Sequence, residues 1–163
     1  MKLKRGQSYA LDLGASLVLF IILLGLFELY WAQTVDQENP VEQLRLEANR
    51  ISQQLVEQGG IPFDWNASTV SYLGLSVERL VIDSGKLETL VFLNSNYSDL
   101  KNLLDVRYEF LLTLNYSNST VVNTVNGPAI VGSWPAFDSL AVSQQTQTLY
   151  EGNRTILYVV AWR

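Results

Sequence analysis

The chain of 163 residues is acidic, with a formal net charge of −5, and it is 48% hydrophobic and 17% charged. It contains neither cysteine nor histidine, which excludes disulfides, thiolate and imidazole metal sites, cysteine nucleophiles and histidine-based catalytic triads. An acidic chain repels the phosphates of nucleic acid, so we expect no nucleic acid partner. The length suits one ordinary domain beside an anchoring segment.

The N-terminal residues combine a short basic segment with a long apolar run. The basic side chains of this segment are Lys2, Lys4 and Arg5. Gly6 and Gln7 follow them, and residues 13–27 form an uncharged apolar run. A secretory signal peptide carries its cleavage site behind the apolar run, as an A-x-A pattern, and no such pattern stands there in this chain. The bond between Gly6 and Gln7, in front of the apolar run, is therefore the expected cleavage site.

The apolar run is long enough to cross a membrane. Residues 13–32 number 20 and include one acid, Glu28, and a helix of that length measures about 30 Å, the thickness of a bilayer core. Tyr30 and Trp31 lie where interfacial aromatic residues are found, and a position at headgroup level is favoured for Glu28. No basic residue follows the run until Arg45. The positive-inside bias predicts a cytoplasmic N-terminus, with the rest of the chain outside.

The segment Lys4-Arg5-Gly6-Gln7, followed by the apolar run, resembles the class III signal peptide of archaeal type IV pilins and related pilin-like proteins. The resemblance covers about residues 1–32. It implies that a prepilin peptidase cuts between Gly6 and Gln7 and removes residues 1–6 as a leader. It also implies that the retained apolar helices bundle into the core of a filament. The implied partners are further copies of the chain in a helical homopolymer, a pilus assembly ATPase and a membrane platform protein.

Asp12 and three small residues are the candidates for contacts between subunits. In bacterial type IV pilins an acid at the fifth place of the mature chain pairs with a neighbour's N-terminal amine, whereas here the acid is Asp12, one place later. An acid near a newly formed amine favours such an ion pair, and we expect this role for Asp12. Gly14, Ala15 and Gly25 permit close approach of helices, although small residues are also ordinary content of membrane helices.

A second helical pattern follows the apolar run. Apolar residues recur at three- and four-residue steps at Val41, Leu44, Ala48, Ile51 and Leu55. This stripe predicts an amphipathic helix that packs on a globular head. Pro40 precedes it and predicts either a kink or a break, while Gly59-Gly60 ends it. If unbroken, the predicted helix of residues 7–58 has a length of about 75 Å. Its acids Glu42, Glu47 and Glu57 are interpreted as a solvated face.

Residues 59–163 are expected to form a globular head built mainly from strands. Residues 107–114 alternate in the manner of a half-buried strand. Residues 154–162 are apolar on both faces, which predicts a central strand with the helix on one side. The further strand candidates are residues 70–75, 78–82, 120–125 and 137–150. Residues 86–92 and 98–104 are interpreted as short helices or loops.

The predicted outer part carries five N-x-S/T sequons. Their asparagines are Asn66, Asn96, Asn115, Asn118 and Asn153. A sequon is an acceptor for N-glycosylation and indicates a surface loop. Asn115 and Asn118 flank a turn-like segment and are expected to be the most exposed. As a set, the sequons favour an exported, glycosylated protein.

No residue pattern predicts an enzyme, a cofactor or a metal site. A phosphate-binding glycine loop, a G-x-S-x-G elbow and an H-E-x-x-H motif are all missing from the sequence. Asp99 and Asp105 lack the alternating oxygen ligands of a calcium loop. Trp65, Trp134 and Trp162 could form a platform for sugars, but core or rim packing is favoured for them.

The sequence therefore predicts an α+β, type IV pilin-like fold, in which a long N-terminal helix packs on a small antiparallel sheet. The expected function is that of a structural subunit of an extracellular filament, for adhesion or surface attachment, held in the plasma membrane before assembly. The alternative is an uncleaved, single-span surface protein with a glycosylated binding ectodomain. A tethered enzyme is a third interpretation, which the lack of a catalytic motif disfavours.

Overall fold

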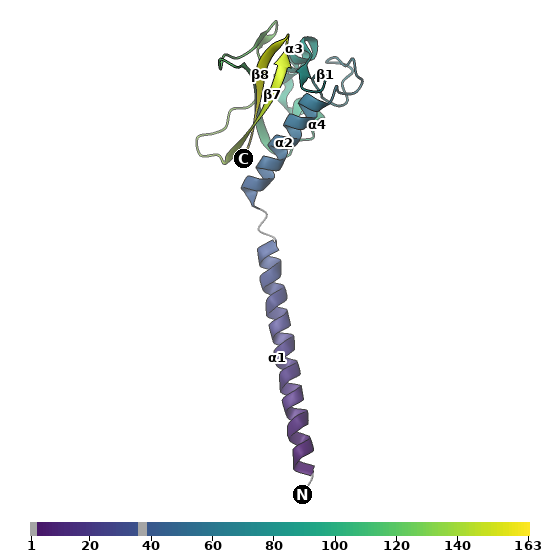
Figure 1. Cartoon of the computed structure of the whole chain (residues 1–163), viewed down its shortest axis with the longest axis vertical. Coiled ribbons are helices and arrows are strands. Elements are labelled where there is room, and N and C mark those ends of the chain that lie inside the picture. Colours follow the sequence, from purple (N-terminus) through teal and green to yellow (C-terminus); the bar gives the residue numbers. More distant parts are fainter. Residues whose placement is uncertain (1–2, 36–38) are drawn as a thin grey trace. The chain divides into compact units, whose positions relative to one another are not determined.

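The computed structural model describes residues 3–35 and 39–163, with side chains described for residues 13–31 and 39–163. The chain divides into two compact units, Met1–Asn39 and Pro40–Arg163. The first contains one helix and the second a mixed α+β head (Figure 1). The boundary between the units therefore lies ahead of the amphipathic helix, whereas the sequence placed the start of the head at residue 59.

The helical segment predicted over residues 7–58, with a kink or a break left open at Pro40, contains two helices. Helix α1 spans Leu3–Val35, and helix α2 spans Pro40–Glu57. Pro40 is the first residue of α2, a position that suits proline because its fixed φ matches a helix and no hydrogen bond to its nitrogen is needed there. Because α1 ends at Val35 and α2 begins at Pro40, the described residues show a break and not a kink.

Helix α2 buries the predicted apolar stripe in the core of the head. Leu44, Ala48, Ile51 and Leu55 have no exposed surface. Val41 is 43% exposed, so the buried stripe begins one turn later than predicted. Helix α2 lies against strands β7 (Ala141–Tyr150) and β8 (Asn153–Trp162).

A six-stranded sheet forms the body of the head. Its strand order is β1-β2-β7-β8-β3-β6, where β1 is Ser76–Glu78, β2 is Val81–Ile82, β3 is Glu109–Tyr116 and β6 is Ile130–Gly132. Every neighbouring pair is antiparallel except β2 with β7. A separate pair joins β4 (Asn123–Thr124) to β5 (Gly127–Pro128).

Strand β8 is central, as its sequence predicts. It pairs with β7 on one side and β3 on the other. Leu157, Val159 and Ala161 are fully buried on the face toward α2. The alternate residues, among them Tyr158 and Trp162, are half-buried on the other face.

Two short helices complete the core. Helix α3 spans Ser84–Leu93, the 3-10 helix η1 spans Asn94–Asn96, and α4 spans Tyr97–Leu104. The Asp83 side chain caps α3 by accepting a hydrogen bond from the backbone nitrogen of Lys86 at 2.9 Å. Leu87, Leu90 and Leu100 are fully buried in the same cluster as the α2 stripe. Residues 86–92 and 98–104, interpreted as short helices or loops, are therefore helical.

Residues 70–75, predicted as a strand, form a loop on the C-terminal end of α2. Leu73 and Leu75 are buried, which explains the alternating pattern. The backbone nitrogen of Leu75, however, donates to the carbonyl of Leu55 at 2.9 Å rather than to a strand. Gly74 lies so close to α2 that an added Cβ would stand 2.3 Å from the carbonyl oxygen of Gln58. An isolated bridge, Ile61 with Tyr72, is the only ladder contact described for this loop.

Three other predicted strands are shorter than expected. Residues 78–82 contain a turn, because Leu80 has a φ of 67° and reverses the chain between β1 and β2. Residues 120–125 contain only the two-residue strand β4. Residues 137–150 contribute β7 from Ala141 onward, and the segment before it is a loop.

Candidate functional site

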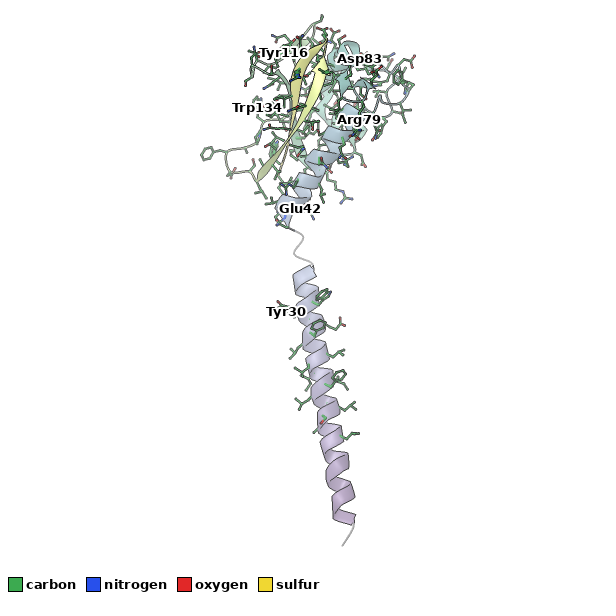
Figure 2. All side chains as sticks on the ribbon, in the orientation of Figure 1. Tyr30, Glu42, Arg79, Asp83, Tyr116 and Trp134 are labelled. Carbon is green, nitrogen blue, oxygen red and sulfur yellow. The ribbon has the colours of Figure 1, made fainter. Side chains whose placement is uncertain are left out.

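The apolar part of α1 is the most prominent candidate site, because its large hydrophobic side chains are exposed. The span Leu13–Trp31 comprises 19 residues with a mean hydropathy of 2.3, and none of it is buried. Its large hydrophobic side chains are 50% to 74% exposed, and they project on all sides of the helix (Figure 2). Such a helix is long and apolar enough to cross a membrane.

Burial of this span is strongly favourable in any apolar surrounding. Each large side chain gains about 1.5–3 kcal/mol when it is removed from water. At the C-terminal end of the span the rings of Phe27 and Trp31 stack with centroids 6.0 Å apart, beside Tyr30, where interfacial aromatic residues are expected. An added Cβ on Gly14 or Gly25 would meet no atom within 4 Å, so both positions are open to a neighbouring helix.

The residues of the predicted leader and cleavage site are only partly covered by the structure. Lys2 lies outside the described residues. The side chains of Lys4, Arg5, Gln7 and Asp12 also lie outside the described part, although their backbone, with that of Gly6, belongs to α1. Processing between Gly6 and Gln7 and pairing by Asp12 therefore stay predictions.

The five sequon asparagines differ in their surroundings. Asn66, Asn96, Asn118 and Asn153 are exposed. Asn115, expected among the most exposed, is half-buried in β3, opposite Ile156, and its Oδ1 is buried without a hydrogen-bond partner. The strand register, which the sequence does not reveal, places it there.

Two of the sequons form tight local turns. Asn66 Oδ1 accepts hydrogen bonds from Ser68, at 3.0 Å from the backbone nitrogen and 2.7 Å from Oγ. Asn118 Oδ1 accepts two equivalent bonds from Thr120, at 3.1 and 2.6 Å. In the sequon of Asn153, by contrast, the Thr155 hydroxyl is buried and shares a 2.8 Å hydrogen bond with Thr148.

A polar cluster joins α4, β3 and the loop after β6. Glu109 Oε1 lies 2.7 Å from Lys101 Nζ, and Glu109 Oε2 accepts a 2.7 Å hydrogen bond from the Tyr97 hydroxyl. Ser133 Oγ donates to the same Oε2 at 3.3 Å. The hydrogen bond from Lys101 holds the pKa of Glu109 below its usual value, while burial raises the pKa of Tyr97. A carboxylate held ionised and saturated by donors is suited to fastening elements, not to donating a proton.

Lys86 fastens the loop of residues 59–65. Its Nζ donates to the carbonyl of Gly59 at 2.8 Å and lies 4.2 Å from the ring centroid of Phe63. The side chain borders a cavity of about 400 Å³ together with Trp65 and Asp83. Burial lowers the pKa of Lys86, and the nearby carboxylates of Asp83 and Asp64 oppose that shift. Because its ammonium is bound to backbone carbonyl groups, this lysine serves the fold.

Trp65, Trp134 and Trp162, considered as a platform for sugars, differ in their surroundings. Trp65 is buried, and its Nε1 donates to the carbonyl of Gly74 at 2.8 Å, which agrees with the packing role favoured for it. Trp162 is half-buried at the end of β8 and donates to the carbonyl of Ser133 at 3.3 Å. Trp134 is 69% exposed on the loop after β6 (Figure 2).

Glu47, interpreted as part of a solvated face, instead joins α2 to the turn before β3. Its Oε1 lies 3.1 Å from Arg50 Nη2 and accepts a 3.1 Å hydrogen bond from the backbone nitrogen of Arg107. Arg50 Nη2 donates in turn to the carbonyl of Asp105 at 2.7 Å. The spacing of Glu47 and Arg50 can be read from the sequence. The backbone groups of Arg107 and Asp105 that they bind cannot. Glu42 and Glu57 remain solvated and pair with exposed arginines.

Among the described residues, no group of His, Cys, Asp or Glu could hold a metal ion. Asp99 and Asp105 lie near the two ends of α4. Comparisons of the chain with protein-family models, with curated proteins and with solved structures give no match.

Proposed function

We propose that the chain is a structural subunit of an extracellular type IV pilus-like filament, used for adhesion or attachment to surfaces. The observation that carries the proposal is the apolar span Leu13–Trp31, none of which is buried, shortly after Lys4-Arg5-Gly6-Gln7. A basic segment, a cleavable glycine and a retained apolar helix are the parts that such a subunit needs. The mixed α+β head, with an amphipathic helix on an antiparallel-rich sheet, is compatible with a pilin-like fold.

In this proposal the plasma membrane holds the precursor, with its N-terminus in the cytoplasm and its head outside. A prepilin peptidase then cuts between Gly6 and Gln7. Transfer of the apolar helix from lipid into a bundle of equal helices is nearly neutral in hydrophobic free energy, so packing and ion pairing decide it. Gly14, Ala15 and Gly25 allow close approach, and Asp12 pairs with the new amine of a neighbour. The assembly ATPase and the membrane platform protein supply the work and the scaffold.

Glycans would belong on the outer surface of such a filament. Asn66, Asn96 and Asn118 are exposed, and we assign N-linked sugars to these three. Asn115 and Asn153 are less suited, because Oδ1 of the first is buried and the sequon hydroxyl of the second, on Thr155, is buried. Sugars at the exposed positions add solubility and shield the backbone from proteases.

The substitution Gly6→Val tests the proposal in cells that make the chain. A branched side chain at the cleavage site blocks the peptidase, so we expect uncut precursor in the membrane and no filament. Ser8→Val is the matched control, because it introduces the same side chain and leaves Gly6 in place, and we expect it to be cut.

The same experiment separates the two interpretations of the apolar helix. An uncleaved, single-span surface protein does not depend on Gly6, so its surface level and start at Met1 would be the same with glycine or valine. Filaments built from uncut Gly6→Val chains would likewise contradict the proposal.

A further inference from the structure

A loop between β6 and β7 presents an aromatic ring and an acid together. Phe137 is fully exposed, and Asp138 beside it is exposed as well. The two residues occupy the middle of a turn in which the backbone nitrogen of Ser139 donates to the carbonyl of Ala136 at 3.1 Å. An aromatic side chain in such a position is accessible to a partner, and buried aromatic residues are among the anchors that carry most of the binding free energy of interfaces.

The loop is fastened where it meets the sheet. Leu140 and Arg163 exchange two backbone hydrogen bonds of 3.2 Å. Trp162 Nε1 donates to the carbonyl of Ser133 at the beginning of the loop. Phe137 is therefore held at the end of the β7–β8 hairpin where β7 begins and β8 ends.

A cavity lies at the other end of the same hairpin. It has a volume of about 540 Å³, within the range of ligand pockets. Leu80, Leu149 and Ile156 give it an apolar lining, and Arg79 and Arg154 add positive charge. Arg79 pairs with Glu57 at 3.6 Å, while Arg154 is exposed and forms no ion pair among the described residues.

The ring and the cavity cannot meet within one copy of the chain. Eight residue steps of β7 lie between Ala141 and Leu149, which at about 3.4 Å per residue is about 27 Å. A projection at one end of an element and a cavity at its other end suit a head-to-tail contact between copies, and such a contact builds an open filament when its rotation does not close into a ring.

We propose that Phe137 of one copy inserts into the cavity lined by Leu80, Leu149 and Ile156 of the next copy. Asp138 then faces Arg154, so the contact is complementary in charge as well as in shape. This inference rests on the proposed function and names a contact between heads, in addition to the bundle of apolar helices. A glycan on Asn153 would obstruct the cavity. The hydroxyl of Thr155, in the same sequon, is buried, so this position is less suited to glycosylation.

Because the chain contains no cysteine, a pair of introduced cysteines reports the contact directly. In filaments that carry Phe137→Cys with Leu149→Cys, mild oxidation is expected to give a ladder of covalent multimers on a non-reducing gel. Gln53→Cys with Leu149→Cys is the control, since Gln53 is exposed on α2, an element that takes no part in the proposed contact. It is expected to give no ladder.

Phe137→Cys removes the ring and could by itself prevent assembly. A charge exchange therefore tests the same contact with Phe137 in place. Asp138→Arg and Arg154→Asp, each alone, are expected to reduce the yield of filaments about threefold to tenfold. The two changes together are expected to restore the yield.

The failure of this contact is distinguishable from the failure of the filament proposal. Unchanged chains that start at Gln7 in filaments, with no ladder from the cysteine pair and no rescue by the charge exchange, would overturn the contact alone. Unchanged chains that form no filament would overturn the proposed function and the contact with it.

Discussion

Glu109 illustrates how single polar side chains hold the head together. It receives hydrogen bonds from Tyr97, Lys101 and Ser133, which belong to α4 and to the loop after β6. These donors stabilise the ionised carboxylate, which is why its pKa is lowered. The alternation in the sequence places Glu109 on the face of β3 opposite Phe110 and Leu112, but its three partners depend on tertiary packing.

Glu109→Gln tests this cluster through the pH dependence of stability. A carboxylate whose folded-state pKa is depressed contributes stability above its unfolded pKa of about 4.3, and this contribution is lost as the pH falls through the folded value. We therefore expect Glu109→Gln to lower the free energy of unfolding by about 1 kcal/mol at pH 7. The difference should vanish well below pH 4.

Urea unfolding of the Pro40–Arg163 segment measures the loss in free energy of unfolding at pH 7 and at pH 3. Glu78→Gln is the control, because Glu78 is exposed and forms no ion pair among the described residues. Equal losses at the two pH values for Glu109→Gln would contradict the role assigned to its charge.

At the scale of elements, helices and strands could be predicted where apolar residues recur in a strong and regular pattern. The apolar stripe of α2 and the doubly apolar sequence of β8 are enough to predict which element lies in the core. The alternation of β3 is only partly right, because Leu111 is buried as well as Phe110 and Leu112. The loop of residues 70–75 shows the limit, because Leu73 and Leu75 alternate as in a strand yet pack on α2. The parallel pairing of β2 with β7 and the burial of Asn115 follow from long-range register, which no local pattern encodes.

Ile51→Ala tests the packing of α2 on the sheet. Ile51 is fully buried in the core cluster, so its truncation leaves a cavity and is expected to lower the free energy of unfolding by about 2–5 kcal/mol. Leu46→Ala is the matched control on the same helix. Leu46 is 61% exposed, and its change should stay within about 0.5 kcal/mol. Similar losses for both variants, measured by urea unfolding, would contradict the observed face of α2.

At the scale of the whole molecule, the head carries its own core and α1 carries an exposed apolar surface. The core cluster lies entirely within the unit Pro40–Arg163. The apolar span Leu13–Trp31 contributes nothing to that core. The exposed apolar surface and the hydrophobic core therefore belong to different units of the chain.

A fragment of residues 40–163 is expected to fold in water and to unfold in one cooperative transition. A fragment of residues 60–163 lacks the buried leucines, isoleucine and alanine of α2. At about 2–5 kcal/mol for each of Leu44, Ile51 and Leu55, this loss is as large as the roughly 5–15 kcal/mol that stabilises a typical domain. Circular dichroism with thermal unfolding shows which of the two fragments is folded. A folded 60–163 fragment would contradict the assignment of α2 to the head.

The central claim is that the chain is cut behind Gly6 and polymerises with its apolar helix at the new N-terminus. Mass spectrometry of the N-terminal peptide from sheared surface filaments tests it most directly. We predict a peptide that begins at Gln7, recovered from the filaments. A peptide that begins at Met1 or Lys2, recovered only from membranes, would contradict the claim and establish an anchored ectodomain instead.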